Sequence, residues 1–264
     1  MSGLLDTTVS PRPWGVDQLP APFVTPPGER IGEVWFTPPT ALDQLLVKYI
    51  FTSEKLSVQV HPSDAQAPAG SRGKEECWLI LAADPGAVLA IGFDAPITPE
   101  AMRAAALDGS IERLLTWHRV KPGDFFYIPA GTVHAIGPGL SLIEIQQNSD
   151  ITYRLYDYGR PRELHLDAAV QVALGQPHDP ALRRHVAATG AVQLVTGPHF
   201  RLDRLDGPPA ADAAARYHGP LLVLPLDTPM LIGGVPAAPG QCALADDIGV
   251  IEFAGRCLIT QPVR

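Results

Sequence analysis

The chain has 264 residues, a net charge of −8 and no run of basic residues, so nucleic acid is not an expected partner. Hydrophobic residues make up 46% of the sequence, which is enough for a large core and excludes general disorder. We expect neither a membrane helix nor a secretion signal, because no apolar stretch is long enough and the N-terminus lacks a basic segment.

Prolines and glycines are spread along the chain and separate many short apolar segments, which is typical of an all-β fold. We expect residues 1–30 to wrap the surface. Thr98-Pro99-Glu100 predicts the start of a helix, and a second short helix is expected from Ser110 to Trp117. Together these helices form an insertion at about 98–117. The strands predicted around this insertion are 31–36, 45–51, 56–60, 77–81, 88–93, 125–128, 135–136, 140–146 and 152–156.

The composition changes near His165, where a helix over 166–174 and a connection over 175–188 are expected. Six short strands follow, at 192–195, 200–205, 221–224, 230–232, 249–253 and 257–260. We find no internal sequence repeat, but the rhythm of the strands favours two β modules. The predicted domains are residues 1–165 and residues 166–264.

Three separate segments supply side chains that are suited to a metal ion. Ser57, Gln59 and His61 alternate, so they point to one face of a strand. Glu76 and His134 lie in two further segments. Two imidazoles and one carboxylate, with an amide oxygen as a further ligand, suit Zn²⁺ or another divalent cation with a position open for substrate. An open position indicates an enzyme rather than a structural zinc site.

Six segments follow one another along the chain as motifs: Ile31–Trp35, Ser57–Pro62, Gly73–Trp78, Phe126–Ile136, Ile143–Arg154 and Arg160–His165. These segments, in this order, resemble type I mannose-6-phosphate isomerases of the short bacterial kind, which are cupin proteins. The stretch from Gly123 to His134 matches the second cupin motif, although Pro138 stands where that motif has Asn. Gln59 and His61 stand where the first motif has two histidines.

This resemblance implies two jelly-roll barrels of the cupin type, of which the second binds no metal. The metal ligands that it implies are Gln59, His61, Glu76 and His134. The residues that it implies for the sugar pocket are Lys74, Glu144, Asp150 and Arg154, with Ser57 near the substrate phosphate. Arg154 is the implied catalytic arginine, and the base that moves the proton stays open between Glu144 and Lys74.

The implied activity interconverts mannose 6-phosphate and fructose 6-phosphate through an enediol, with one divalent metal ion, Zn²⁺ or another, per chain. A divalent cation suits this chemistry because it polarises the carbonyl and no redox step is needed. A small sugar phosphate is the expected partner of a monomer or homodimer. The three cysteines lack CxxC spacing, which predicts a reduced cytoplasmic protein.

Several alternatives remain open at this point. Glu144 could lie on a solvent face of its strand, Arg154 could form an ordinary salt bridge, and the Arg160–His165 segment could be a phosphate rim or a solvated loop. We expect Glu75 to face away from the metal by strand alternation. The remaining functional alternatives are an isomerase of another sugar phosphate or of a free sugar, an Fe²⁺ dioxygenase, and a sugar-binding protein without activity. The histidines expected to have no function are His118, His178, His185, His199 and His218.

Overall fold

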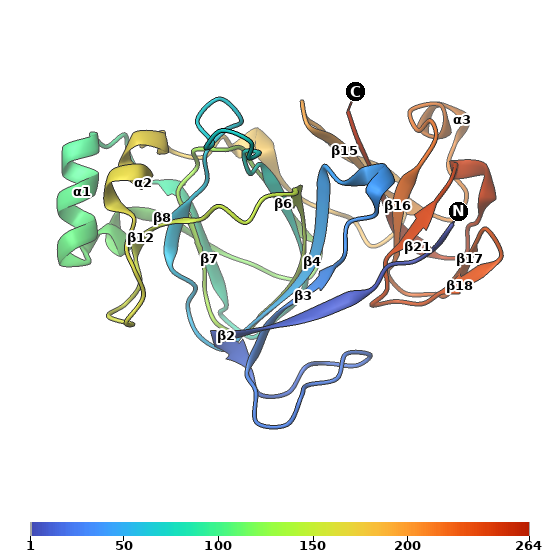
Figure 1. Cartoon of the computed structure of the whole chain (residues 1–264), viewed down its shortest axis with the longest axis horizontal. Helices are drawn as coiled ribbons and strands as arrows, with labels where there is room; N and C mark the ends of the chain where they lie inside the picture. Colours follow the sequence, from blue (N-terminus) through green and yellow to red (C-terminus); the bar gives the residue numbers. More distant parts are fainter. Residues whose placement is uncertain (1, 264) are drawn as a thin grey trace.

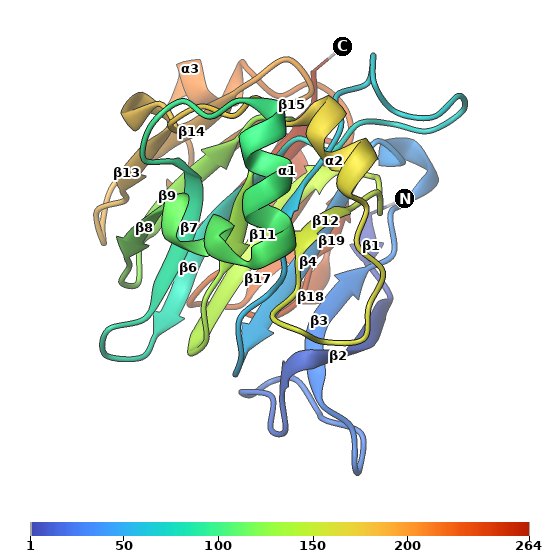
Figure 2. The same cartoon turned by 90° about the vertical axis from the view of Figure 1, so that its left-hand side faces the viewer.

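Four antiparallel sheets and a layer of helices are stacked along the long axis of the computed structural model, which describes residues 2–263 (Figure 1). Helices α1 (Pro99–Asp108) and α2 (Leu166–Val172) cover the outer face of a five-stranded sheet (Figure 2). The strands of this sheet are, in order, β12 (Tyr153–Tyr156), β5 (Val58–Val60), β10 (His134–Ile136), β7 (Val88–Phe93) and β8 (Leu115–Arg119).

A seven-stranded sheet packs against the inner face of the five-stranded sheet and completes the first barrel. Its strands are β13 (Arg183–His185), β9 (Asp124–Ile128), β6 (Glu76–Ala83), β11 (Leu140–Gln147), β4 (Leu45–Thr52), β3 (Ile31–Phe36) and β2 (Thr7–Val16). All eight residues of β4 are buried, because this strand is covered on both faces.

The C-terminal module begins after β13 and packs on the outer face of the seven-stranded sheet. Its six-stranded sheet runs β1 (Gly3–Leu4), β19 (Ala243–Ala245), β16 (Leu221–Pro225), β21 (Arg256–Pro262), β15 (Phe200–Asp206) and β14 (Val192–Thr196). A three-stranded sheet follows, with β18 (Val235–Ala237), β17 (Met230–Ile232) and β20 (Ile251–Glu252), together with a short helix α3 (Ala211–Ala214).

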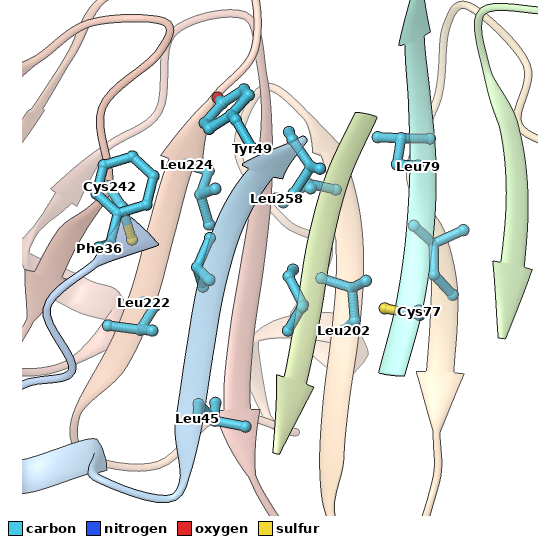
Figure 3. Packing of buried hydrophobic residues seen from close by; sticks show 14 of the residues in the cluster. Phe36, Leu45, Tyr49, Cys77, Leu79, Leu202, Leu222, Leu224, Cys242 and Leu258 are labelled. Atoms are coloured by element: carbon cyan, nitrogen blue, oxygen red, sulfur yellow. The ribbon is translucent and has the colours of Figure 1, made fainter. Parts of the chain in front are cut away.

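Strand β6 shows how alternation builds both cores. Cys77 and Leu79 join the apolar cluster between the two modules, which also contains Leu258 of β21 (Figure 3). Trp78 and Ile80 point to the opposite face and join the interior of the first barrel. Because successive side chains of a strand point to opposite faces, one strand serves both cores.

The structure confirms the all-β fold with a helical insertion. Thr98 caps α1 as expected, since its hydroxyl accepts a hydrogen bond from the Ala101 N–H, and Gly109 ends the helix with a φ of 77°. The prediction of a second helix from Ser110 to Trp117 is wrong in part. Ser110–Leu114 forms a short 3-10 helix, and Leu115–Arg119 is strand β8. Among the described residues, none of the helices is long and apolar enough to cross a membrane.

Three segments without predicted strands join the sheets, and one of them, residues 233–248, contains β18 and β19. Residues 1–30 contain β1 and β2 rather than a surface wrap alone, and the connection over 175–188 contains β13, which pairs with β9. The division of the chain at 165 and 166 stays a prediction. Helix α2 and strand β13 lie against the first barrel, and β1 pairs with β19 of the C-terminal module.

We expect Leu258→Ala to destabilise the whole chain, because Leu258 is fully buried between the two modules. Removing a leucine side chain from such a site costs about 2–5 kcal/mol of unfolding free energy. Urea unfolding measures this loss. Leu107→Ala is the matched control, because Leu107 is 66% exposed on α1 and its removal changes the free energy by no more than about 0.5 kcal/mol. Equal effects of the two substitutions would contradict tight packing between the modules.

Candidate active site

The five-stranded sheet places three of the predicted site residues in one row. In the antiparallel register, His134 of β10 pairs with Gln59 of β5, and Gln59 pairs with Arg154 of β12. Directly opposed residues of neighbouring strands point to the same face of a sheet. Glu76 reaches the same place from the first position of β6 in the facing sheet. The site therefore lies between the two sheets of the first barrel.

His61, Glu76 and His134 form a compact group whose candidate ligand atoms all lie within 4.8 Å of one another. The Nε2 atom of His61 is 3.6 Å from one Glu76 oxygen, and the Nε2 atom of His134 is 3.4 Å from the other. Gly131 allows this approach: its φ is +84°, and its N–H donates to the His61 carbonyl. The tight turn at Gly131 thus joins the two histidine segments.

Hydrogen bonds fix the orientation of both imidazoles. The Nδ1 atom of His61 lies 2.8 Å from the Ile151 carbonyl, and that of His134 lies 3.0 Å from the Thr132 carbonyl. A proton on Nδ1 leaves Nε2 as a free acceptor that faces Glu76. Burial, followed by the nearby Lys74 charge, lowers the pKa of His134 to about 4 and that of His61 well below its ordinary value. Both imidazoles are therefore neutral at pH 7.

These residues fit a divalent cation. Both Glu76 oxygens are buried and lack a hydrogen bond of good geometry within residues 2–263, although Lys74 Nζ lies 3.0 Å from one of them. Burial raises the pKa of the Glu76 carboxyl to about 7, against the opposing effect of Lys74. Two neutral imidazoles and a carboxylate without hydrogen bonds are the donor set that Zn²⁺ and similar ions prefer.

Gln59 stands next to this group. Its Nε2 atom lies 3.2 Å from His134 Nε2, and its Oε1 accepts a hydrogen bond from the Ser57 hydroxyl at 3.1 Å. The two ends of an amide are exchanged by a turn of the side chain. Such a turn would direct the Gln59 oxygen towards His134 Nε2, so Gln59 could be a further ligand of a metal ion held by His134.

A chain of alternating charges runs from this group across the barrel. Lys74 Nζ lies 3.2 Å from His61 Nε2 and 3.8 Å from Glu144, and Lys48 Nζ lies 3.2 Å from the same Glu144 oxygen. Trp78 Nε1 donates to the other Glu144 oxygen at 3.0 Å. Burial opposes ionisation of Glu144, but Lys74 and Lys48 outweigh it and lower its pKa to about 2.

The same carboxylates keep Lys74 charged. Burial alone would lower its pKa, but Glu144 and Glu76 raise it to about 12. In the free protein Lys74 is therefore an ammonium without a lone pair, whereas Glu144 is an ionised carboxylate that can accept a proton. The protonation states favour Glu144 over Lys74 as a proton acceptor.

The charge chain continues to the pocket rim through residues that the motifs did not indicate. Lys48 Nζ lies 4.0 Å from Glu33 and 4.4 Å from the centre of the Trp35 ring, and Arg12 pairs with Glu33 at 2.6 Å. One sequence signal for Lys48 exists: it is the only charge in an otherwise apolar strand, and such a charge needs a partner. The register supplies that partner, because Glu144 of β11 lies directly opposite Lys48.

A cavity of about 560 Å³ opens over these residues, which is large enough for a small-molecule ligand. The predicted residues that line it are Ser57, Gln59, Lys74, Glu144, Asp150 and Arg154. His61, Glu76 and His134 lie directly behind its wall, in contact with Gln59 and Lys74. Two residues of the Arg160–His165 segment also line the cavity, Arg162 and His165. The residues that had no predicted role in the pocket are Arg12, Glu33, Trp35, Lys48 and Trp78.

The Arg154 guanidinium is without a hydrogen bond or ion pair in the described part of the chain, and its Nε atom is buried. Burial, and then the neighbouring Arg162 and Arg12, lower the pKa of Arg154. The alternative of an ordinary salt bridge at Arg154 is therefore wrong. Arg162 instead pairs with Asp157, as does Arg160, which does not line the cavity.

Comparison with known proteins agrees with the motifs. A mannose-6-phosphate isomerase of Streptococcus mutans is 44% identical over 142 residues, which are 50% of this chain and 45% of that protein. One from Bacillus subtilis is 47% identical over 137 residues, which are 48% and 43% of the two chains. Over about half of its length, the chain is similar in sequence to proteins named mannose-6-phosphate isomerase. No family model matches it.

The solved structures extend the likeness to the whole fold. The crystal structure of mannose 6-phosphate isomerase from Bacillus subtilis superposes with a TM-score of 0.79 at 25% identity and covers 98% of both chains. A zinc-bound mannose 6-phosphate isomerase has a TM-score of 0.72 at 13% identity and covers all of both chains, which shows a common fold. In sequence, the chain spans about half the length of the curated relatives it matches, from 43% to 58%.

Proposed function

We propose that the chain is a metal-dependent aldose–ketose isomerase that interconverts mannose 6-phosphate and fructose 6-phosphate. The observation that carries this proposal is the His61, Glu76 and His134 group behind a pocket that contains Lys74, Glu144 and Arg154. The sequence relatives bear the name of this activity. One Zn²⁺ ion per chain is the proposed cofactor, held by these three residues and Gln59.

A bound divalent cation supplies Lewis acidity, which polarises a substrate carbonyl or hydroxyl oxygen. The residues of the chain provide the remaining steps. Glu144, an ionised carboxylate in the pocket, accepts the proton from one carbon of the open sugar and returns it to the neighbouring carbon, while the hydroxyl proton passes between the two oxygens. Lys74 stays an ammonium and holds Glu144 and the substrate oxygens in place by charge.

Arg154 supports an anionic substrate. Its guanidinium forms no hydrogen bond or ion pair within residues 2–263, and burial, followed by the nearby Arg162, lowers its pKa. Guanidinium groups bind phosphate through paired hydrogen bonds, so a phosphate bound at Arg154 would supply the anionic partner that this side chain lacks. We therefore assign phosphate recognition to this side of the pocket, with Ser57 and Asp150 as further substrate contacts. The cytoplasmic location and the oligomeric state stay predictions.

The purified protein is expected to convert mannose 6-phosphate to fructose 6-phosphate, to lose this activity on chelation and to regain it with Zn²⁺. A coupled assay for fructose 6-phosphate measures the conversion. Turnover of free mannose at the same rate would contradict phosphate recognition. Oxygen consumption with Fe²⁺ would instead indicate a dioxygenase, and sugar-phosphate binding without turnover would indicate a binding protein.

A further inference from the structure

The segment that carries Lys74 and Glu76 also carries Glu75, whose side chain contacts the protein on the side away from the pocket. The family motifs do not include Glu75. Lys74 and Glu76 point towards the pocket, and Glu75 between them points to the opposite side, where it is only 6% exposed. The Tyr127 hydroxyl of β9 donates a hydrogen bond to Glu75 Oε1. Glu75 thus lies outside the pocket, as expected, and is engaged in a buried contact.

The backbone of the same segment is fixed on both sides of Lys74. The Glu75 N–H donates to Gln147 Oε1 at 2.9 Å, and the Gln147 N–H donates back to the Glu75 carbonyl at 3.0 Å. Gln147 Nε2 also donates to Asp64 Oδ1, which accepts the Gly73 N–H at 2.7 Å. Glu75 and Gly73 are therefore both anchored, and the position of Lys74 between them follows.

The C-terminal module closes over this arrangement with the turn between β14 and β15. A side chain added at Gly197 would overlap the Tyr127 hydroxyl and lie 3.2 Å from Glu75 Oε1. The Phe200 ring packs against the Tyr127 ring with 6.3 Å between the centroids, and His199 Nδ1 lies 3.5 Å from Asp64 Oδ2. The turn thus contacts both anchors of the segment.

We propose that Glu75, Tyr127 and the Gly197 turn of the C-terminal module are positioning residues, which fix the segment of Lys74 and Glu76 for metal binding. The proposal rests on the metal site of the proposed function but not on the identity of the sugar. Glu75 and Tyr127 neither line the pocket nor belong to the His61, Glu76 and His134 group, so they act only through the chain segment that they hold. In this way the C-terminal module, for which no metal site is predicted, contributes to the metal site of the first barrel.

The test measures the dissociation constant of Zn²⁺ by competition with a chromophoric chelator, alongside urea unfolding. Residues that hold metal ligands typically change metal affinity by about 10–100-fold when they are removed, so we expect Glu75→Ala and Gly197→Ala to weaken zinc binding about tenfold or more. Glu75→Gln keeps an oxygen for the Tyr127 hydroxyl and is expected to retain the affinity. Gly3→Ala is the matched glycine control, because a side chain there meets no atom within 4 Å.

Unchanged zinc affinity in Glu75→Ala and Gly197→Ala would overturn the proposal, even if both variants were less stable. Equal weakening by Glu75→Gln and Glu75→Ala would also overturn it, because the hydrogen bond to Tyr127 would then be irrelevant. If Glu75→Ala does not fold, Tyr127→Phe decides the same question, since it keeps the packing against Phe200 and removes only the hydroxyl. If the protein binds zinc but does not isomerise the sugar phosphate, the proposed function is contradicted. The zinc affinities of the variants then still decide whether Glu75 and Tyr127 are positioning residues.

Discussion

His134→Ala is expected to lose both bound zinc and isomerase activity while the chain remains folded. His134 Nε2 faces Glu76 and Gln59 at the centre of the proposed site. Loss of residues that merely support a metal ligand costs about 10–100-fold in metal affinity, so loss of the ligand itself should cost at least about a hundredfold. The fold should survive, since a single buried substitution typically costs about 0.5–3 kcal/mol.

Metal analysis after gel filtration, together with the isomerase assay and circular dichroism, checks this expectation. His218→Ala serves as the control, because His218 is an exposed histidine of the C-terminal module. It should retain one zinc ion per chain and full activity. Stoichiometric zinc in folded His134→Ala protein would show that the metal centre is wrongly assigned.

Arg154→Ala should lower kcat by about 10²–10³-fold without loss of zinc, which is the size of effect that a single charge-stabilising group has on turnover. The Arg154 guanidinium lines the pocket and has no partner among the described residues, so its charge is available to the substrate. Its place next to Gln59 in the sheet brings it close to the metal group without making it a ligand.

Steady-state kinetics and zinc content, measured on the same protein sample, separate the two roles of Arg154. Arg184→Ala is the matched control, because Arg184 is exposed on β13, away from the pocket, and its side chain donates a hydrogen bond to the Gln193 carbonyl at 3.4 Å. Arg154→Lys should recover only part of the loss, since lysine lacks the planar pair of donors. Parallel losses of zinc and activity in Arg154→Ala would mean that Arg154 supports the structure of the site instead.

The sequence could predict those site residues that occur in local motifs. His61 follows a strand of alternating residues, and His134 follows the tight turn at Gly131, so their direction depends on near neighbours. For Glu144, the strand pattern allows either a pocket position or a solvent face. The structure places it in the pocket, 3% exposed, because Lys48 and Trp78 lie opposite it on the two adjacent strands.

The remaining pocket residues depend on pairings between distant segments, and no local pattern contains those. Lys48 meets Glu144 only through the register of β4 and β11, 96 residues apart. Arg12 meets Glu33 only because β2 pairs with β3. The isolated charge of Lys48 showed that a partner must exist but not which one.

Short strands at the edges were missed for a related reason. Strands β1 and β13 contain two and three residues, and each pairs with a sheet edge from a distant segment. The predicted helix over 110–117 runs into strand β8 at residues 115–117, because β7 offers this segment an unpaired edge. Such tertiary pairing overrides local propensity.

Strand β1 has a consequence for the order in which the protein can assemble. Gly3 pairs with Leu244, so β1 can form its pairing only after β19 has been made. Contacts so far apart in sequence form slowly, since the intervening chain must first be brought together. The first barrel can begin to form during synthesis, whereas β1 stays without its partner strand until the residues of β19 have emerged. Until then, β1 offers unpaired backbone groups to another chain.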